Sequence, residues 1–162
     1  MVVLAVGLLI AVRVWQDRQQ PAPPESLAEG DYVVARVVDG DTLLLENDAR
    51  VRLIGVDAPE SVKPDHPVEP FGPEASAFAR ELVGNAGNTV RLQFDKERVD
   101  QYGRFLAFVW VGEQLLNEEL IRAGFAHAEM GFRYSSSMKT RLRRAEEEAK
   151  HAGRGIWTMG GG

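Results

Sequence analysis

The feature that most constrains the fold of this chain is a series of short runs rich in β-branched and apolar residues. Turn-forming "DG" and "NDA" separate the first three of these runs, which predicts a three-stranded meander. A helical segment and then the polar "DKERVDQYG" interrupt the later ones. The five predicted strands are "YVVARVV" (32–38), "TLLLE" (42–46), "RVRLIGV" (50–56), "TVRLQF" (89–94) and "RFLAFVWV" (104–111).

Three further segments have helical periodicity. In "GPEASAFARELVGNA" (72–86), Pro73 suits a first helical position and apolar residues recur on one face. "QLLNEELIRAG" (114–124) is amphipathic and stops at Gly124, and 135–153 begins with a serine suited to an N-cap. Five strands and three helices without an internal repeat predict a small α+β domain, with a partly open five-stranded barrel as one natural closure.

The N-terminal segment differs from the rest of the chain. The apolar run from Val2 to Val12 is short for a membrane span and is interrupted by Arg13, but it has the length of a signal-peptide core. We expect a signal peptide or signal-anchor over 1–15, a Pro-rich linker over 16–29, a folded domain over 30–158 and a flexible tail over 159–162. A mis-assigned start codon or a buried helix is the alternative for the first segment.

Composition limits the chemistry. The absence of cysteine excludes disulfides, thiol catalysis and zinc–thiolate sites. The formal net charge of -5 means that attraction of a polyanion has to come from local clusters of cations or from a bound metal.

Carboxylates gather at two predicted strand ends. Asp39 and Asp41 flank a glycine in "DGDT", a pattern that a simple turn also explains. Asp57 and Glu60 lie in "GVDAPE", where Pro59 ends the strand that carries an arginine. Calcium takes six to eight oxygen ligands from carboxylates, carbonyls and water, so Asp41 and Asp57 predict a loose calcium site. Magnesium suits such a site less well.

Two arginines indicate that this carboxylate cluster belongs to a phosphate-binding site. Arg104 begins the fifth predicted strand, and alone it is typical of a solvated side chain. Together with Arg52 it supplies two permanently charged guanidiniums, which bind phosphate oxygens in bidentate fashion. Such groups stabilise the negative charge that develops in phosphodiester hydrolysis, and Glu60 is placed to orient or deprotonate water. Because Arg52 and Asp57 lie an odd number of positions apart, the strand must bend for both to face one site.

The sequence resembles the staphylococcal nuclease-like (thermonuclease) family. The matching fragments occur in family order between Tyr32 and Trp157: "DGDT", "VRLIGVDAPE", "FGPEAS", "DQYGR", "LNEELIRAGFA" and "GIW". The resemblance implies an OB-fold barrel with three α-helices. It also implies calcium-dependent cleavage of DNA and RNA that leaves 3′-phosphates.

The same resemblance assigns roles to individual residues. Asp41 and Asp57 match the calcium carboxylates, Arg52 and Arg104 match the phosphate-binding pair, and Glu60 matches the water-positioning glutamate. Supporting positions are Asp39, Thr42, Asp100 and Tyr102, the last two assigned to substrate binding.

The chain departs from the family pattern at two places. Ala58 replaces a frequent threonine, at a position where the resemblance implies a calcium ligand through the backbone carbonyl. The paired tyrosines that some members present to the nucleotide base are absent, with Met130 and Phe132 near those positions. Phe132 and Tyr134 are the expected replacements, since stacking tolerates different aromatic residues.

We therefore expect a monomeric, calcium-dependent nuclease, secreted or anchored to a membrane through its N-terminal segment on the extracytoplasmic side. Nucleic acid, both DNA and RNA, is the expected partner. A non-catalytic OB-fold module that binds nucleic acid or protein is the first alternative, and an envelope structural domain is the second.

Overall fold

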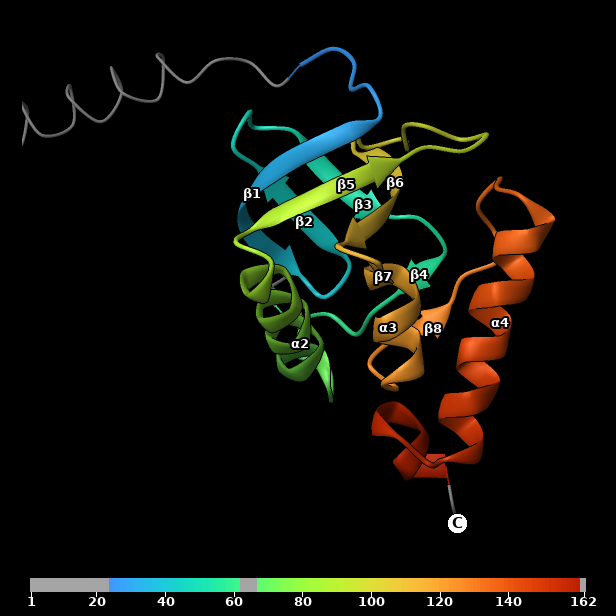
Figure 1. Ribbon diagram of the computed structural model, residues 1–162. Helices are drawn as coiled ribbons and strands as arrows, with labels where there is room; N and C mark the ends of the chain where they lie inside the picture. Colours follow the sequence, from blue (N-terminus) through green and yellow to red (C-terminus); the bar gives the residue numbers. More distant parts are fainter. Residues whose placement is uncertain (1–23, 62–66, 161–162) are drawn as a thin grey trace, which may run out of the picture.

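The computed structural model describes residues 24–61 and 67–160 (Figure 1). The predicted signal segment, most of the predicted linker and the loop residues Lys63 and His66 lie outside this range. In the described part of the chain, no helix has the length and apolar character needed to cross a membrane.

The strands form a closed barrel. The sheet has the order β3-β2-β1-β5-β6-β7, and β3 also pairs with β6 in parallel, at Val51 with Phe105 and Arg52 with Leu106. This pairing closes the five longest strands into a barrel, which confirms the expected five-stranded OB-fold. The strands are β1 (Gly30–Asp39), β2 (Thr42–Leu45), β3 (Arg50–Leu53), β4 (Val56–Asp57), β5 (Thr89–Gln93), β6 (Phe105–Val111), β7 (Gln114–Leu115) and β8 (His127–Ala128).

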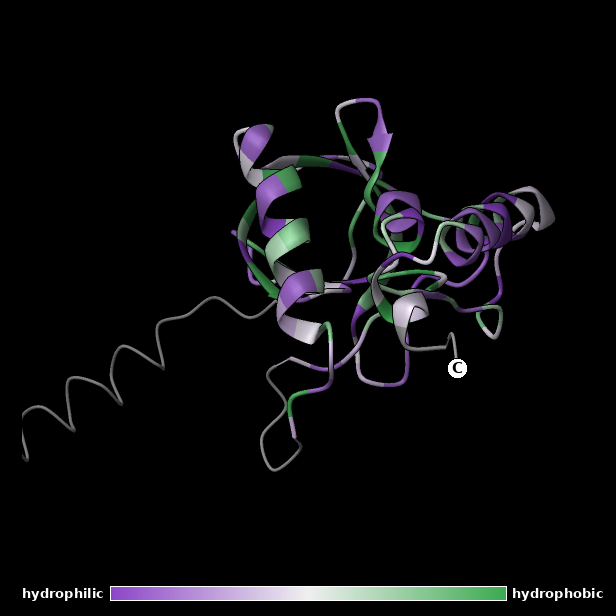
Figure 2. Ribbon diagram, turned by 90° about the horizontal axis from the view of Figure 1, so that it is seen from below, coloured by the Kyte–Doolittle hydropathy of each residue, from purple (hydrophilic) through white to green (hydrophobic). Residues whose placement is uncertain are grey.

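Three α-helices lie beside the barrel, which confirms the predicted α+β class (Figure 1). They are α2 (Gly72–Asn85), α3 (Leu116–Arg122) and α4 (Ser136–His151), and a 3₁₀ helix η1 (Gly155–Gly160) follows. The predicted second helix is shorter than expected because Gln114 and Leu115 pair with β6 as β7. Green apolar and purple polar residues alternate along α2 in Figure 2, which fits its buried Ala75 and Ala79.

Alternation along β2 and β3 separates the core from the site. Leu43, Leu45 and Val51 are almost fully buried and fill the barrel interior. Thr42 and Arg52 are cross-strand partners, and because successive side chains in a strand point to opposite faces, both lie on the outer face of the barrel.

The predicted strand 50–56 is interrupted, and the interruption is the bend that the site requires. Gly55 adopts a left-handed conformation with φ 76°, and a Cβ there would come within 2.6 Å of Leu142 Cδ1. A turn at this glycine separates β3 from β4, which pairs instead with β8. Asp57 is thereby redirected toward the face that carries Arg52.

Both predicted domain limits differ from the structure. Leu27 is buried, and its carbonyl accepts a hydrogen bond from Arg98 Nη2 (2.8 Å). Glu29 accepts one from the backbone N–H of Phe94 (2.9 Å). Two residues at the end of the predicted linker, Leu27 and Glu29, therefore contact the folded domain: Leu27 buries an apolar side chain, and each residue accepts a hydrogen bond from the segment after β5. At the other end, η1 extends through Gly160, into the predicted tail.

Candidate active site

A cavity of about 580 Å³ lies on the outer face of the barrel, where β1, β2, β3 and β4 meet the loop before β6. It brings together all five charged residues predicted to carry out catalysis or hold metal. Its lining is Val38, Asp39, Asp41, Thr42, Arg50, Arg52, Asp57, Ala58, Glu60, Tyr102 and Arg104.

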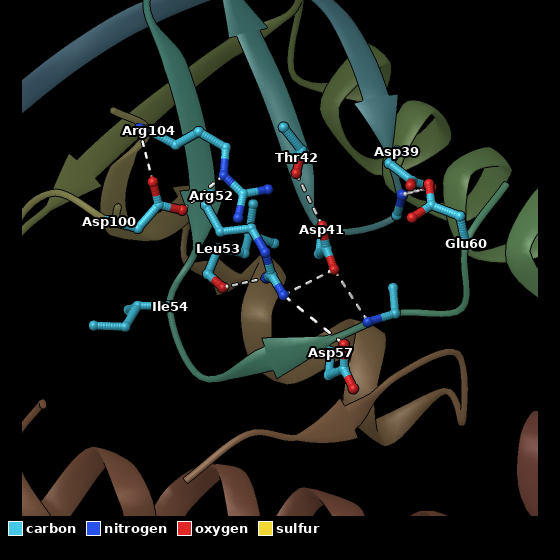
Figure 3. A network of polar contacts seen from close by, with 12 residues as sticks. Asp39, Asp41, Thr42, Arg52, Leu53, Ile54, Asp57, Glu60, Asp100 and Arg104 are labelled. Carbon is cyan, nitrogen blue, oxygen red and sulfur yellow. Dashed lines mark hydrogen bonds and ion pairs between the residues drawn. The ribbon is translucent and has the colours of Figure 1, made fainter. Parts of the chain in front are cut away.

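Arg52 is the central cation of this cavity. Its side chain is only 9% exposed, and its Nη1 donates to the Leu53 carbonyl at 2.9 Å. Its Nη2 lies 3.0 Å from Asp41 Oδ2 and 4.0 Å from Asp57 Oδ1, and Figure 3 shows both carboxylates directed at it. These contacts fix the guanidinium in one orientation.

Asp41 is a buried carboxylate with several partners. Its Oδ1 accepts from Thr42 Oγ1 (2.9 Å), and its Oδ2 accepts from the Ala58 N–H (3.2 Å). Burial raises the pKa of Asp41 above its usual 3.8, although Arg52 and the hydrogen bonds oppose that rise. The ionised carboxylate is therefore short of compensating positive charge, and a further cation would stabilise it.

The donor chemistry beside Asp41 suits a hard cation. Asp57 presents a carboxylate that is 60% exposed and lies 4.0 Å from Arg52 Nη2. Within residues 24–61 and 67–160, no group of three or more His, Asp or Glu side chains is arranged to hold a metal. Water and backbone carbonyls would have to supply most ligands, which calcium accepts readily. The residues therefore fit a loosely held calcium ion.

Asp100 orients the second arginine. Its Oδ1 accepts from the backbone N–H groups of Tyr102 (2.9 Å) and Arg104 (3.0 Å), and its Oδ2 accepts from Arg104 Nε (2.7 Å). Burial alone would raise the pKa of Asp100, but these hydrogen bonds bring it below its usual 3.8. Its carboxylate is occupied by Arg104 and this turn, so Asp100 holds the arginine in place. The contact of Asp100 with substrate that we expected from the sequence stays a prediction.

Arg104 itself extends toward the cavity (Figure 3). Its guanidinium carbon lies 5.5 Å from the centre of the Tyr102 ring. Tyr102 is 74% exposed, so this ring stands at the mouth of the cavity and is open to a ligand.

Glu60 approaches from the loop that follows β4. Its backbone carbonyl accepts from the Glu69 N–H (2.9 Å), and a Cβ on Gly72 would come within 2.5 Å of that carbonyl oxygen. The start of α2 therefore packs tightly on Glu60. In Figure 3 its carboxylate lies near Asp39, with Asp41 between it and Arg52.

The two predicted base-stacking aromatics have different surroundings. Phe132 lies with its ring 5.9 Å from the guanidinium carbon of Arg52 and lines an adjoining cavity of about 330 Å³. Tyr134 is buried, packs edge-on against Phe108 and donates to the Glu129 carbonyl at 2.7 Å. Burial raises the pKa of Tyr134 to about 12. Its assignment as a nucleotide contact is wrong, because the ring belongs to the core.

Comparisons with known proteins identify the family of this chain. A family profile described as "Staphylococcal nuclease homologue" matches residues 50–159. The thermonuclease of Staphylococcus intermedius is 38% identical over 162 residues, covering 96% of this chain and 94% of that protein. The chain belongs to the staphylococcal nuclease family.

Two other relatives match most of the length of this chain. The thermonuclease of Staphylococcus hyicus is 41% identical over 133 residues, 80% of this chain and 77% of that protein. Endonuclease YncB of Bacillus subtilis strain 168 is 35% identical over 153 residues, 90% of this chain and 72% of that protein. The family inferred from the sequence motifs is thus confirmed.

One arginine of the cavity was given no role in the sequence analysis. Arg50 also lines the cavity, on the same face of β3 as Arg52. The two-residue spacing of the arginines within one strand was the available signal, since residues i and i+2 share a face.

Proposed function

We propose that the protein is a calcium-dependent nuclease that hydrolyses phosphodiester bonds of DNA and RNA and leaves 3′-phosphates. The observation that carries the proposal is that Arg52 and Arg104 line one cavity with Asp41, Asp57 and Glu60. The names of its thermonuclease and endonuclease relatives support the same reaction class. Both nucleic acids are proposed as substrates because the charged lining groups address the phosphodiester that the two polymers share.

In the proposed mechanism the arginines bind the reacting phosphate. Arg52, held by the Leu53 carbonyl and Asp41, donates to one non-bridging oxygen, and Arg104, held by Asp100, donates to another. Both bonds strengthen as negative charge develops on these oxygens. Calcium at Asp41 and Asp57, with the Ala58 carbonyl as a further ligand, would add positive charge beside the same phosphate.

The remaining groups place water and the substrate strand. Glu60 orients the attacking water or takes its proton, from the side of the cavity opposite Arg104. Phe132 stacks on a neighbouring base, and Tyr102 lies at the mouth, where a phosphate at the chain end would reach it.

We further propose that the protein acts outside the cytoplasm as a monomer. The location rests on the apolar residues Val2 to Val12, whose length suits an export signal or anchor. The monomer is carried over as an expectation from the sequence. N-terminal sequencing of exported protein tests whether the segment is removed, and sedimentation velocity tests the monomer.

A calcium titration of hydrolysis on single-stranded and duplex DNA and on RNA tests the nuclease. We expect cleavage with millimolar calcium, none with chelator, and a loss of several orders of magnitude in Arg104→Ala with an unchanged circular dichroism spectrum. Intact nucleic acid at high protein and calcium would instead favour the non-catalytic binding module. End-labelling of the products decides whether the phosphate stays on the 3′ side.

A further inference from the structure

A second cationic hollow lies beside the candidate active site. It has a volume of about 280 Å³, between the second half of β1 and the end of α2, and two arginines line it. Its lining contains no carboxylate: Val34, Ala35, Arg36, Val37, Arg80, Val83 and Asn88.

Both arginines of this hollow have exposed, unneutralised charge. Arg36 is exposed on the outer face of β1, and Arg80 is exposed on α2, which packs against β1. Across the described ranges 24–61 and 67–160, neither forms a salt bridge, in contrast to Arg52, Arg91 and Arg122. In a protein of net charge -5, two such arginines with no lining carboxylate create a local attraction for anions.

The hollow and the candidate active site are lined by consecutive parts of β1. Residues 34–37 of β1 line the hollow, and Val38 and Asp39, next on the same strand, line the site. On the outer face, Arg36 pairs with Leu44, and Leu44 pairs with Arg50, which lines the site. The arginines therefore form a path from the site across β3, β2 and β1 to α2.

The length of this path suits a polynucleotide backbone. From Arg50 across β2 to Arg36 the path crosses two strand spacings of about 4.8 Å each, which makes about 10 Å. A nucleic-acid strand in a duplex carries one phosphate per about 3.4 Å of axis, so this distance spans about three phosphates.

We propose that Arg36 and Arg80 form a phosphate-binding subsite for the substrate strand, outside the groove where the reaction occurs. The proposal rests on the proposed nuclease function and deepens it: the preferred substrate is a polynucleotide long enough to reach from Arg104 to Arg80. Arg36 and Arg80 touch backbone phosphates only, so they add affinity without base preference.

The test compares a 24-nucleotide single strand with a dinucleotide as substrates of the full chain and of Arg36→Gln/Arg80→Gln. We expect KM for the 24-mer to rise at least threefold, with kcat and dinucleotide kinetics unchanged. In chelator, anisotropy of a labelled 24-mer should give a salt slope lower by about 1.4, since each single-strand phosphate contact contributes about 0.7.

Arg143→Gln/Arg154→Gln is the matched control: both arginines are exposed, on α4 and the segment after it, away from β1 (Figure 1), and within the described ranges 24–61 and 67–160 neither forms a salt bridge, whereas Arg144 pairs with Glu148. An equal fall in salt slope in this control would overturn the proposal, since net charge alone would then explain the effect. A 24-mer KM and salt slope that match wild type would overturn it as well. An equal rise in KM for the 24-mer and for the dinucleotide would also overturn the proposal.

The chelator experiment separates this proposal from the nuclease itself. If wild type cleaves neither substrate, the nuclease proposal fails, but a reduced salt slope in the variant still supports a phosphate subsite. In a further outcome, inorganic phosphate inhibits the variant less strongly than wild type while the two have the same affinity for the 24-mer. In that case the hollow binds free anions, and the proposed strand path is refuted.

Discussion

Replacement of Asp100 by asparagine tests whether the orientation of Arg104 controls the reaction rate. The asparagine keeps the side-chain shape, and its carbonyl oxygen can still accept from the two backbone N–H groups that now meet Oδ1. Its amide nitrogen then replaces the Oδ2 that accepts from Arg104 Nε at 2.7 Å. Two donors face one another, so the guanidinium loses its charge-assisted bond and turns away.

The magnitude follows from that one bond. A hydrogen bond between charged groups contributes about 1.5–3 kcal/mol. If the transition state experiences all of this, kcat falls about 10- to 150-fold, because each 1.36 kcal/mol changes the rate tenfold. The assay is steady-state hydrolysis of a labelled single strand at saturating calcium, with urea unfolding measured on the same samples.

Asp95→Asn is the matched control. Asp95 also accepts from two backbone N–H groups, those of Lys96 (2.8 Å) and Ser135 (3.0 Å), but it holds no arginine. We expect its variant to lose about 1–2 kcal/mol of stability and to keep its kcat. A kcat for Asp100→Asn within twofold of this control would refute the reasoning. So would an undiminished effect of Asp100→Asn in an Arg104→Ala background, where the two substitutions should not add.

Three more outcomes are expected. Glu118→Gln should lower the free energy of unfolding by about 3 kcal/mol at pH 7, because this largely buried carboxylate bonds Arg122 (2.6 Å) and Arg141 (2.8 Å) between α3 and α4. Burial alone would raise the pKa of Glu118, but both arginines hold it below its usual 4.5, so wild type should lose this stability as pH falls through that lowered pKa. Calcium at about 100 times its Kd should stabilise wild type by about 2.7 kcal/mol in thermal unfolding, and Asp41→Asn should abolish that gain. Phe132→Ala should raise KM for single-stranded DNA about 5- to 150-fold, since stacking on one base contributes about 1–3 kcal/mol.

Each of these outcomes has a control in the same chain. Glu147→Gln, which removes an exposed partner of Lys150, should cost under about 1 kcal/mol, and a loss equal to that of Glu118→Gln would contradict the buried network. Asp31→Asn should keep the calcium effect, because Asp31 pairs with Arg91 away from the site. Tyr134→Phe should leave KM unchanged. A rise in KM like that of Phe132→Ala would show that Tyr134 contacts the substrate.

Local patterns in the sequence predict the strands and helices but not the closure of the barrel. Alternation of Leu43, Leu45 and Val51 with polar neighbours identifies β2 and β3. The parallel pairing of Val51 with Phe105 joins distant segments through backbone hydrogen bonds, for which side-chain period gives no signal. Leu27 was placed in the linker for a similar reason: its carbonyl accepts a hydrogen bond from Arg98, which lies far along the chain.

The charged residues of the candidate site could be predicted from the sequence more completely than the aromatic residues near it. Charged residues at strand ends carry their chemistry in their type, so Asp41, Arg52 and Arg104 were recognisable before their positions were known. The role of an aromatic residue in a loop is ambiguous from the sequence alone. Nothing in the sequence around Phe132 and Tyr134 distinguishes a base-stacking side chain from a core side chain. The burial of Tyr134 and its tertiary contacts, such as the one with Phe108, assign the tyrosine to the core.

The parallel contact between β3 and β6 also has a consequence for how the protein matures. Arg52 and Arg104 lie on opposite sides of this seam and come together only when it forms. A nascent chain that has already folded its first hairpins still lacks a paired set of guanidiniums. If hydrolysis needs both guanidiniums, as we propose, its onset during refolding is expected to coincide with the docking of β6 on β3.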